Sequence, residues 1–198
     1  SSASFNLSLR GKFQIGKDLI LTAGPSTSFR EAFYAYDAAL NGWNSEWSKY
    51  LTEFENKFAA FVGSKFAIAT SSCTGALHIA LLALDIGPGD EVIVPDVTWV
   101  ATANAVRYVG ATPIFCDVEL DSWNMDPNSL ESLISDKTKA IMPVHMYGNP
   151  ARMDKIMKIA DSYQLKVIED AAPAIGAKFF QKNCGTFGDF GGFSFQGA

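Results

Sequence analysis

The chain has 198 residues, of which 48% are hydrophobic and 19% charged, with 16 glycines and 8 prolines that follow no repeat. This composition excludes collagen, a coiled coil and wholesale disorder, and it indicates a globular protein with a substantial core. The formal net charge of -5 argues against a surface built to hold a nucleic-acid backbone.

The first part of the chain, residues 1–64, is predicted to be a helical segment. Amphipathic patterns over residues 31–40 and 53–61 flank a polar, glycine-bearing loop that carries Trp43 and Trp47. Tryptophans in such a loop serve either as packing lids or as part of a binding wall, and the pattern leaves both interpretations open.

From residue 65 onward, short β-branched runs alternate with helical patterns, which indicates βαβ units around a parallel sheet. The predicted strands cover residues 66–70, 91–94, 112–116, 140–144 and 166–168. The predicted helices begin with one from Thr74 that stops at Gly87, and continue over residues 99–108, 127–134 and 152–163. We therefore expect an α/β fold with three layers and a mostly parallel central sheet, over residues 65–198.

The helix from Thr74 and the tail over residues 176–198 carry further signals. The helix that begins at Thr74 is apolar on nearly every face, so we expect it to be buried on more than one side, between layers or against another subunit. The tail over residues 176–198 is rich in glycine and phenylalanine, which predicts short antiparallel strands and turns. Because it stops within an apolar segment, we expect the polypeptide to continue beyond Ala198.

Ligands of parallel α/β sheets bind at the carboxyl ends of the strands, so the residues just after each strand are the first place to look for a site. Small hydroxyl residues at 71–75 stand at the start of a helix, where free N–H groups favour a phosphate, although alone they are an ordinary helix cap. Trp99 follows the second strand, and His145 follows the fourth. A lone tryptophan at such a place is more often core than ligand stack.

Asp170 is the most informative of these residues. It follows an apolar strand and precedes Ala171 and Ala172, so we expect it to be partly buried and to need a cationic partner. Since no lysine or arginine stands close in sequence, a protonated ligand nitrogen is a candidate. Such a pair at about 4 Å is worth about 4 kcal/mol at an effective dielectric of about 20. A phosphate cradle, an aromatic plane and a buried carboxylate suit a flat phosphorylated heteroaromatic cation, a description that pyridoxal 5'-phosphate (PLP) meets.

Five stretches of the chain carry a family resemblance: ATSSCTGALHIALLAL, GPGDEVIVPDVTWVATANAVRYVGATPIFCDV, PVHMYGNPARMD, VIEDAAPAIGA and GTFGDFGGFSF. In this order and spacing, across residues 50–198, the chain resembles the sugar aminotransferases of the DegT/DnrJ/EryC1/StrS family. The resemblance implies PLP as cofactor and the large domain of the fold type I PLP-dependent transferases, the aspartate aminotransferase fold. The C-terminal small domain would lie outside this chain.

The resemblance also implies roles for single residues. Cys73 and Thr74 would contact the cofactor phosphate, together with the hydroxyl of Ser194. Trp99 would stack on the pyridine ring, and Asp170 would keep the ring nitrogen protonated. The loop around Trp43 would face the substrate.

Two departures from the family pattern stand out. Pro173 occupies the position where the family usually has a Gln, Glu or His that contacts the ring hydroxyl of the cofactor, so another group or a water would have to serve. The Schiff-base lysine of the family is expected directly after Ala198, and the chain stops one position short of it. The catalytic residue is therefore expected outside the chain.

The resulting hypothesis is a PLP-dependent aminotransferase that converts a nucleotide-linked keto-deoxysugar into an amino sugar, with glutamate as amino donor. The resemblance implies a homodimer with a shared active site. One alternative is a dehydratase-type relative in which histidine replaces the lysine; another is a non-catalytic binding or regulatory protein of the same fold, which Pro173 favours. A Rossmann oxidoreductase fits less well, because the glycines of residues 185–191 have the wrong spacing and do not lead from a strand into a helix.

The remaining signals concern metals, redox state and location. The three cysteines are widely spaced and form no Cys-x-x-Cys or Cys/His cluster, so we expect free thiols and no metal site. No apolar stretch approaches the roughly 18 residues of a membrane span, and the N-terminal residues lack the features of a secretory signal. The sequence therefore predicts a cytoplasmic protein that acts without membrane or nucleic-acid partners.

Overall fold

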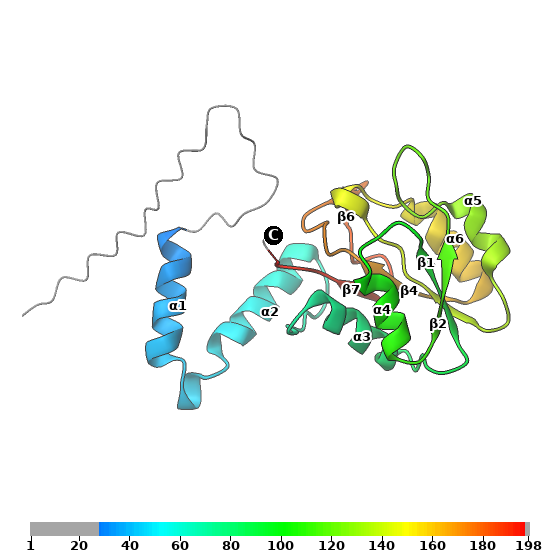
Figure 1. Cartoon of the computed structure of the whole chain (residues 1–198). Helices are drawn as coiled ribbons and strands as arrows, with labels where there is room; N and C mark the ends of the chain where they lie inside the picture. The colour runs from blue at the N-terminus through cyan, green and yellow to red at the C-terminus, as the bar shows by residue number, and fades with distance from the viewer. Residues whose placement is uncertain (1–27, 197–198) are drawn as a thin grey trace, which may run out of the picture.

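A computed structural model describes residues 28–196 of the chain (Figure 1). Residues 1–27 of the predicted N-terminal segment, and the lysine expected after Ala198, lie outside the described residues. The helices are α1 (Phe29–Asn41), η1 (Asn44–Glu46), α2 (Lys49–Val62), α3 (Cys73–Ala83), α4 (Ala101–Tyr108), α5 (Pro127–Leu130), η2 (Glu131–Leu133), η3 (Met146–Gly148) and α6 (Met153–Tyr163). The strands are β1 (Glu91–Pro95), β2 (Thr112–Cys116), β3 (Thr138–Ile141), β4 (Lys166–Asp170), β5 (Lys178–Phe179), β6 (Lys182–Asn183) and β7 (Phe190–Gly192).

The central sheet has five strands in the order β2-β1-β3-β4-β7, and every neighbouring pair is parallel. The carboxyl ends of all five strands therefore meet at one edge. The short strands β5 and β6 form a separate antiparallel pair, as the tail pattern predicted, whereas β7 of the same tail joins the central sheet in parallel. The predicted α/β class with a mostly parallel sheet is confirmed.

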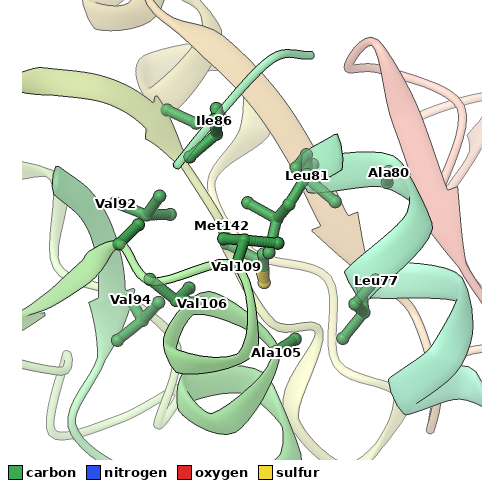
Figure 2. Close-up of a cluster of buried hydrophobic side chains, with 13 residues drawn as sticks. Leu77, Ala80, Leu81, Ile86, Val92, Val94, Ala105, Val106, Val109 and Met142 are labelled. Carbon is green, nitrogen blue, oxygen red and sulfur yellow. The ribbon is translucent and has the colours of Figure 1, made fainter. Parts of the chain in front are cut away.

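Helices cover both faces of this sheet and make three layers. On one face, α3 and α4 pack on alternate residues of the strands, such as Val92 and Val94 of β1 and Ile168 of β4. Figure 2 shows this cluster, in which Leu81, Val109 and Met142 point toward one another between the helices and the sheet. On the other face, α5 and α6 cover the intervening residues of the same strands. The period-two alternation of the strands thus separates two cores.

Helix boundaries follow capping chemistry that is readable in the sequence. Ser28 and Glu31 form a reciprocal capping box at the start of α1. The Asp126 side chain accepts a hydrogen bond from the Asn128 N–H, with Pro127 in the first turn of α5. Such caps satisfy N–H groups that have no helical partner, and the helices begin within four residues of the predicted positions.

The N-terminal helices stand apart from the sheet. None of the residues of α1 is buried, and α1 lies at a distance from the strands, joined to the rest of the molecule through α2 (Figure 1). Helix α2 packs on the segment after β7: the ring of Phe58 lies 5.0 Å from that of Phe193 and 5.2 Å from that of Phe195, between centroids. Aromatic packing thus attaches α2 to the end of the described chain.

One predicted strand is absent. Residues 66–70 form no strand, because no strand within residues 28–196 pairs with them, and a strand needs a neighbour for its N–H and C=O groups. The Ala69 N–H instead bonds to the Glu55 carboxylate of α2 at 2.8 Å. Helix α3 buries one face against the sheet, whereas Ile79 and Leu82 on its other face are half exposed within residues 28–196, so its burial against another subunit stays a prediction.

Candidate functional site

Asp170 is the last residue of β4 and lies at the carboxyl edge of the sheet, with only 5% of its surface exposed. Its carboxylate accepts two hydrogen bonds, from the Thr102 hydroxyl of α4 at 2.7 Å and from the Ala172 N–H at 3.1 Å. Its main chain is also held, because the Asp170 N–H bonds to the Pro143 carbonyl at 2.8 Å. Because Thr102 belongs to α4, the Asp170 side chain points to the face of the sheet that α3 and α4 cover.

No ion pair neutralises this carboxylate. Among residues 28–196, no lysine, arginine or histidine nitrogen lies within 4.0 Å of the Asp170 carboxylate oxygens. Burial raises the pKa of the carboxyl above its ordinary value, and the hydrogen bonds from Thr102 and Ala172 oppose that rise. A buried acid with two neutral donors and no cation is an arrangement that a protonated ligand nitrogen would complete.

The N-terminus of α3 lies beside this carboxylate. The Ser72 side chain caps the helix by accepting the Gly75 N–H at 3.1 Å, and Cys73 and Thr74 occupy the first turn, where N–H groups lack helical acceptors. Asp170 pairs with Gly192 of β7, and a Cβ added to Gly192 would lie 3.2 Å from the Cys73 sulfur. The absent side chain of Gly192 thus lets the start of α3 approach the end of the sheet. The geometry brings together a helix N-terminus, which favours anions, and a buried carboxylate.

Trp99 and Ser194 lie at the ends of the neighbouring elements. Trp99 stands just before α4, with 79% of its surface exposed, and its carbonyl accepts the Thr102 N–H at 3.1 Å. Ser194 follows β7 between Phe193 and Phe195, which both pack on α2. Because successive side chains of an extended segment alternate, we expect Ser194 to point away from α2.

The structure does not bring Trp43 to this edge. Trp43 precedes η1 in the connection between α1 and α2, is 66% exposed, and donates its indole N–H to the Ala39 carbonyl at 2.8 Å. That connection lies at the end of α2 that is remote from the sheet (Figure 1). The substrate-facing role of Trp43 stays a prediction, as do the roles of the other site residues.

A second buried carboxylate belongs to Glu169, the residue before Asp170 in β4. One of its oxygens accepts the N–H groups of Phe187 and Gly188; the other accepts the Gly185 N–H at 2.7 Å and bonds to the His145 Nε2 at 3.0 Å. Both Glu169 and His145 are fully buried. Glu169 therefore holds the glycine-rich loop that leads into β7, on the opposite face of the sheet from Asp170.

Sequence reasoning also missed Thr102. Its buried hydroxyl touches Asp170, 68 positions away in the chain. One signal was available: Thr102 stands three residues after Trp99 in a predicted helix, and residues three apart share a helix face.

Within the described residues, no group of three or more His, Cys, Asp or Glu side chains is arranged to hold a metal ion. None of the helices over residues 28–196 has the length and apolar character needed to cross a membrane. The three cysteines are free thiols.

Comparison with known proteins shows a likeness to sugar aminotransferases. The model of the DegT/DnrJ/EryC1/StrS aminotransferase family matches residues 28–198. GDP-perosamine synthase of Caulobacter vibrioides is 47% identical over 178 residues, which cover 90% of this chain and 48% of that protein. The UDP-N-acetyl-3-dehydro-alpha-D-glucosamine 3-aminotransferase of Acidithiobacillus ferrooxidans is 51% identical over 141 residues, which cover 71% of this chain and 38% of that protein. The chain therefore spans about half the length of the curated relatives that it matches.

Solved structures of aminotransferases also resemble this chain. The X-ray structure of an aminotransferase from Psychrobacter cryohalolentis superposes with a TM-score of 0.83 at 41% identity, covering 87% of this chain and 45% of that one. A protein of Streptococcus pneumoniae named as a sugar aminotransferase, in its PLP form, gives a TM-score of 0.83 at 29% identity, covering 90% of this chain and 49% of that one. The likeness covers about nine-tenths of this chain in both cases.

Proposed function

The chain belongs to the DegT/DnrJ/EryC1/StrS aminotransferase family, and from that premise we propose that it is the cofactor-binding part of a PLP-dependent nucleotide-sugar aminotransferase. The observation that carries the proposal is the buried carboxylate of Asp170, which has no cationic partner among residues 28–196 and lies beside the N-terminus of α3. A helix N-terminus beside a buried carboxylate matches a ligand with a phosphate at one end and a basic ring nitrogen at the other.

The donor set fits PLP. The N–H groups of the first turn of α3, at Cys73 and Thr74, would hold the phosphate, with the Ser194 hydroxyl as a further donor. Asp170 would accept a hydrogen bond from the protonated ring nitrogen, and Trp99 would cover one face of the ring. Pro173 has no side-chain donor for the ring hydroxyl, so we assign that contact to no residue of this chain.

When bound, PLP supplies an electron sink for negative charge that develops at the carbon bonded to the substrate nitrogen. The part played by Asp170 is electrostatic: a carboxylate that keeps the ring nitrogen protonated makes the sink effective. At an effective dielectric of about 20, a charge pair about 4 Å apart is worth about 4 kcal/mol, or about 1000-fold in rate. Burial of Asp170 excludes the water that would weaken this pair.

The substrate follows from the relatives. GDP-perosamine synthase and the UDP-linked 3-aminotransferase carry nucleotide sugars in their names, so we propose a nucleotide-linked keto-sugar as amino acceptor and glutamate as donor. A lysine outside this chain, directly after Ala198, would carry the cofactor and move the proton between substrate and cofactor. We further propose a homodimer with a shared site, in the cytoplasm.

Borohydride reduction of the purified full-length protein, followed by peptide mass spectrometry, tests the cofactor assignment. We expect a reduced PLP adduct on a lysine directly after Ala198. Bound PLP without a lysine adduct would replace the proposal with the dehydratase-type relative, and a protein without PLP would contradict the proposal altogether.

A matched pair of variants tests the role of Asp170. We expect Asp170→Asn to lower the transamination rate by about 1000-fold, because the neutral amide removes the charge pair worth about 4 kcal/mol. Asp161→Asn on the exposed surface of α6 makes the same chemical change away from the site and is expected to react like wild type. A rate near wild type for Asp170→Asn would show that this carboxylate has no part in the reaction.

A further inference from the structure

Thr102 connects two groups that the proposed function places at the cofactor ring. Its side chain is fully buried in the first turn of α4, and its hydroxyl lies 2.7 Å from the Asp170 carboxylate. Its main-chain N–H bonds to the Trp99 carbonyl at 3.1 Å. One residue therefore contacts both the carboxylate and the segment that carries the tryptophan.

The direction of the hydrogen bonds can be assigned. Asp170, as a carboxylate, can only accept, so the single hydroxyl proton of Thr102 is given to Asp170. The Thr98 hydroxyl lies 3.0 Å from that of Thr102, and it must then be the donor of that contact. Thr98, Thr102 and Asp170 form a chain of donors that ends on the carboxylate, an arrangement in which each bond polarises the next.

The titratable side chains near Asp170, among residues 28–196, do not donate to its carboxylate. Two further titratable groups come near Asp170, namely Cys73 of α3 and His145 after β3. Burial, with the Asp170 charge adding to it, raises the pKa of Cys73 to about 12. The imidazole of His145 faces elsewhere: Nε2 bonds to Glu169 and Nδ1 accepts the Ala151 N–H at 3.1 Å. Among residues 28–196, Thr102 is the one side chain that hydrogen-bonds to the Asp170 carboxylate.

We propose that Thr102 is a positioning residue that, through its hydroxyl, holds the Asp170 carboxylate charged and oriented toward the ring nitrogen of the cofactor. The inference rests on the proposed function and adds a residue to it. A hydrogen bond from a hydroxyl disperses the charge of a carboxylate and lowers its proton affinity. Without that bond, a proton shared between Asp170 and the ring nitrogen shifts toward Asp170. Thr102 therefore helps to keep the proton on the ring.

The test uses the full-length protein loaded with PLP that is 15N-labelled in the pyridine ring. Thr102→Val keeps the side-chain shape and removes the hydroxyl. We expect its 15N resonance to move from the protonated toward the neutral pyridine position, and its dissociation constant for PLP to rise by roughly 10- to 100-fold. Thr102→Ser restores the hydroxyl and is expected to return both quantities toward wild type.

Thr138→Val is the matched control. Thr138 is also buried and its hydroxyl oxygen accepts the Ser135 N–H at 2.9 Å, but it starts β3 and so lies at the opposite edge of the sheet. We expect this variant to leave the 15N resonance unchanged. If it moved the resonance as Thr102→Val does, the effect would be one of general packing, and the inference would be wrong.

Two further outcomes separate this inference from the proposed function. Suppose that Asp170→Asn changes both the resonance and the affinity, but Thr102→Val changes neither. That result would overturn the role of Thr102 and leave the aminotransferase proposal intact. A wild-type protein that binds no PLP, or an Asp170→Asn variant with an unchanged resonance, would overturn both together.

Discussion

Replacement of Glu169 by glutamine is expected to destabilise the fold strongly, because all the acceptor capacity of this buried carboxylate is in use. One oxygen accepts the N–H groups of Phe187 and Gly188, and the other accepts those of Gly185 and His145 Nε2. In Glu169→Gln one oxygen becomes an NH2 donor, so either orientation of the amide loses two of the four bonds. Bonds to a charged acceptor are worth about 1.5–3 kcal/mol each, which predicts a loss of about 3–6 kcal/mol.

Urea unfolding of the full-length protein, followed by circular dichroism, measures this loss in the free energy of unfolding. Hydrogen exchange provides a local readout, since the amides of Gly185, Phe187 and Gly188 are expected to exchange faster in the variant. Glu131→Gln is the control, because the exposed Glu131 accepts a single bond from the Tyr163 hydroxyl, and less than about 1 kcal/mol is expected there. A Glu169→Gln protein within about 1 kcal/mol of wild type, with unchanged exchange in this loop, would refute the reasoning.

Two further predictions concern Gly191 of β7 and Cys73 of α3. Gly191→Ala is expected to cost more than about 3 kcal/mol in urea unfolding, because a Cβ there would lie 2.1 Å from the Gly185 carbonyl oxygen, a backbone atom that cannot turn aside. Gly87→Ala, whose Cβ would meet nothing closer than 3.8 Å, is the control, and equal stabilities would contradict the argument. For Cys73, a pKa raised to about 12 leaves roughly 1 thiol in 3000 ionised at pH 8.5. Iodoacetamide should therefore alkylate it at least about 100-fold more slowly in the native protein than in urea, and comparable rates, compared by peptide mass spectrometry, would show that the thiol is not perturbed.

Local pattern was sufficient for most of the fold. Residues 112–116 were predicted as a strand with the bounds that β2 has, and Lys166–Asp170 extends the predicted strand by two residues. Both are short runs that contain β-branched residues, so each is recognisable by itself. Residues 66–70 show the limit of this reasoning. Their exposure alternates as in a strand, with Phe66 73% and Ile68 78% exposed, but pairing depends on a neighbour that local sequence does not specify.

The residues of the site also include some that local sequence could predict and some that it could not. Asp170 was predictable as a partly buried acid from its place between an apolar strand and two alanines, and the small residues at 71–75 were predictable as a helix start. Thr102 and the four donors around Glu169 were not, because their partners lie 16 to 68 positions away in the chain. Contacts over such separations exist only once the strands are ordered in the sheet.

The sequence by itself determined the family and most of the elements, the strand expected over residues 66–70 excepted, since these depend on residues within a few positions of one another or on motifs in fixed order. The tertiary structure alone decided which carboxylate faces which layer. Glu169 and Asp170 are neighbours in β4, and the pleat of the strand sends them to opposite faces of the sheet. One of them meets three main-chain N–H groups and a histidine, and the other meets a threonine and an open helix N-terminus. That separation leaves Asp170 without a cationic partner among residues 28–196, which is the feature on which the proposed role of Asp170 rests.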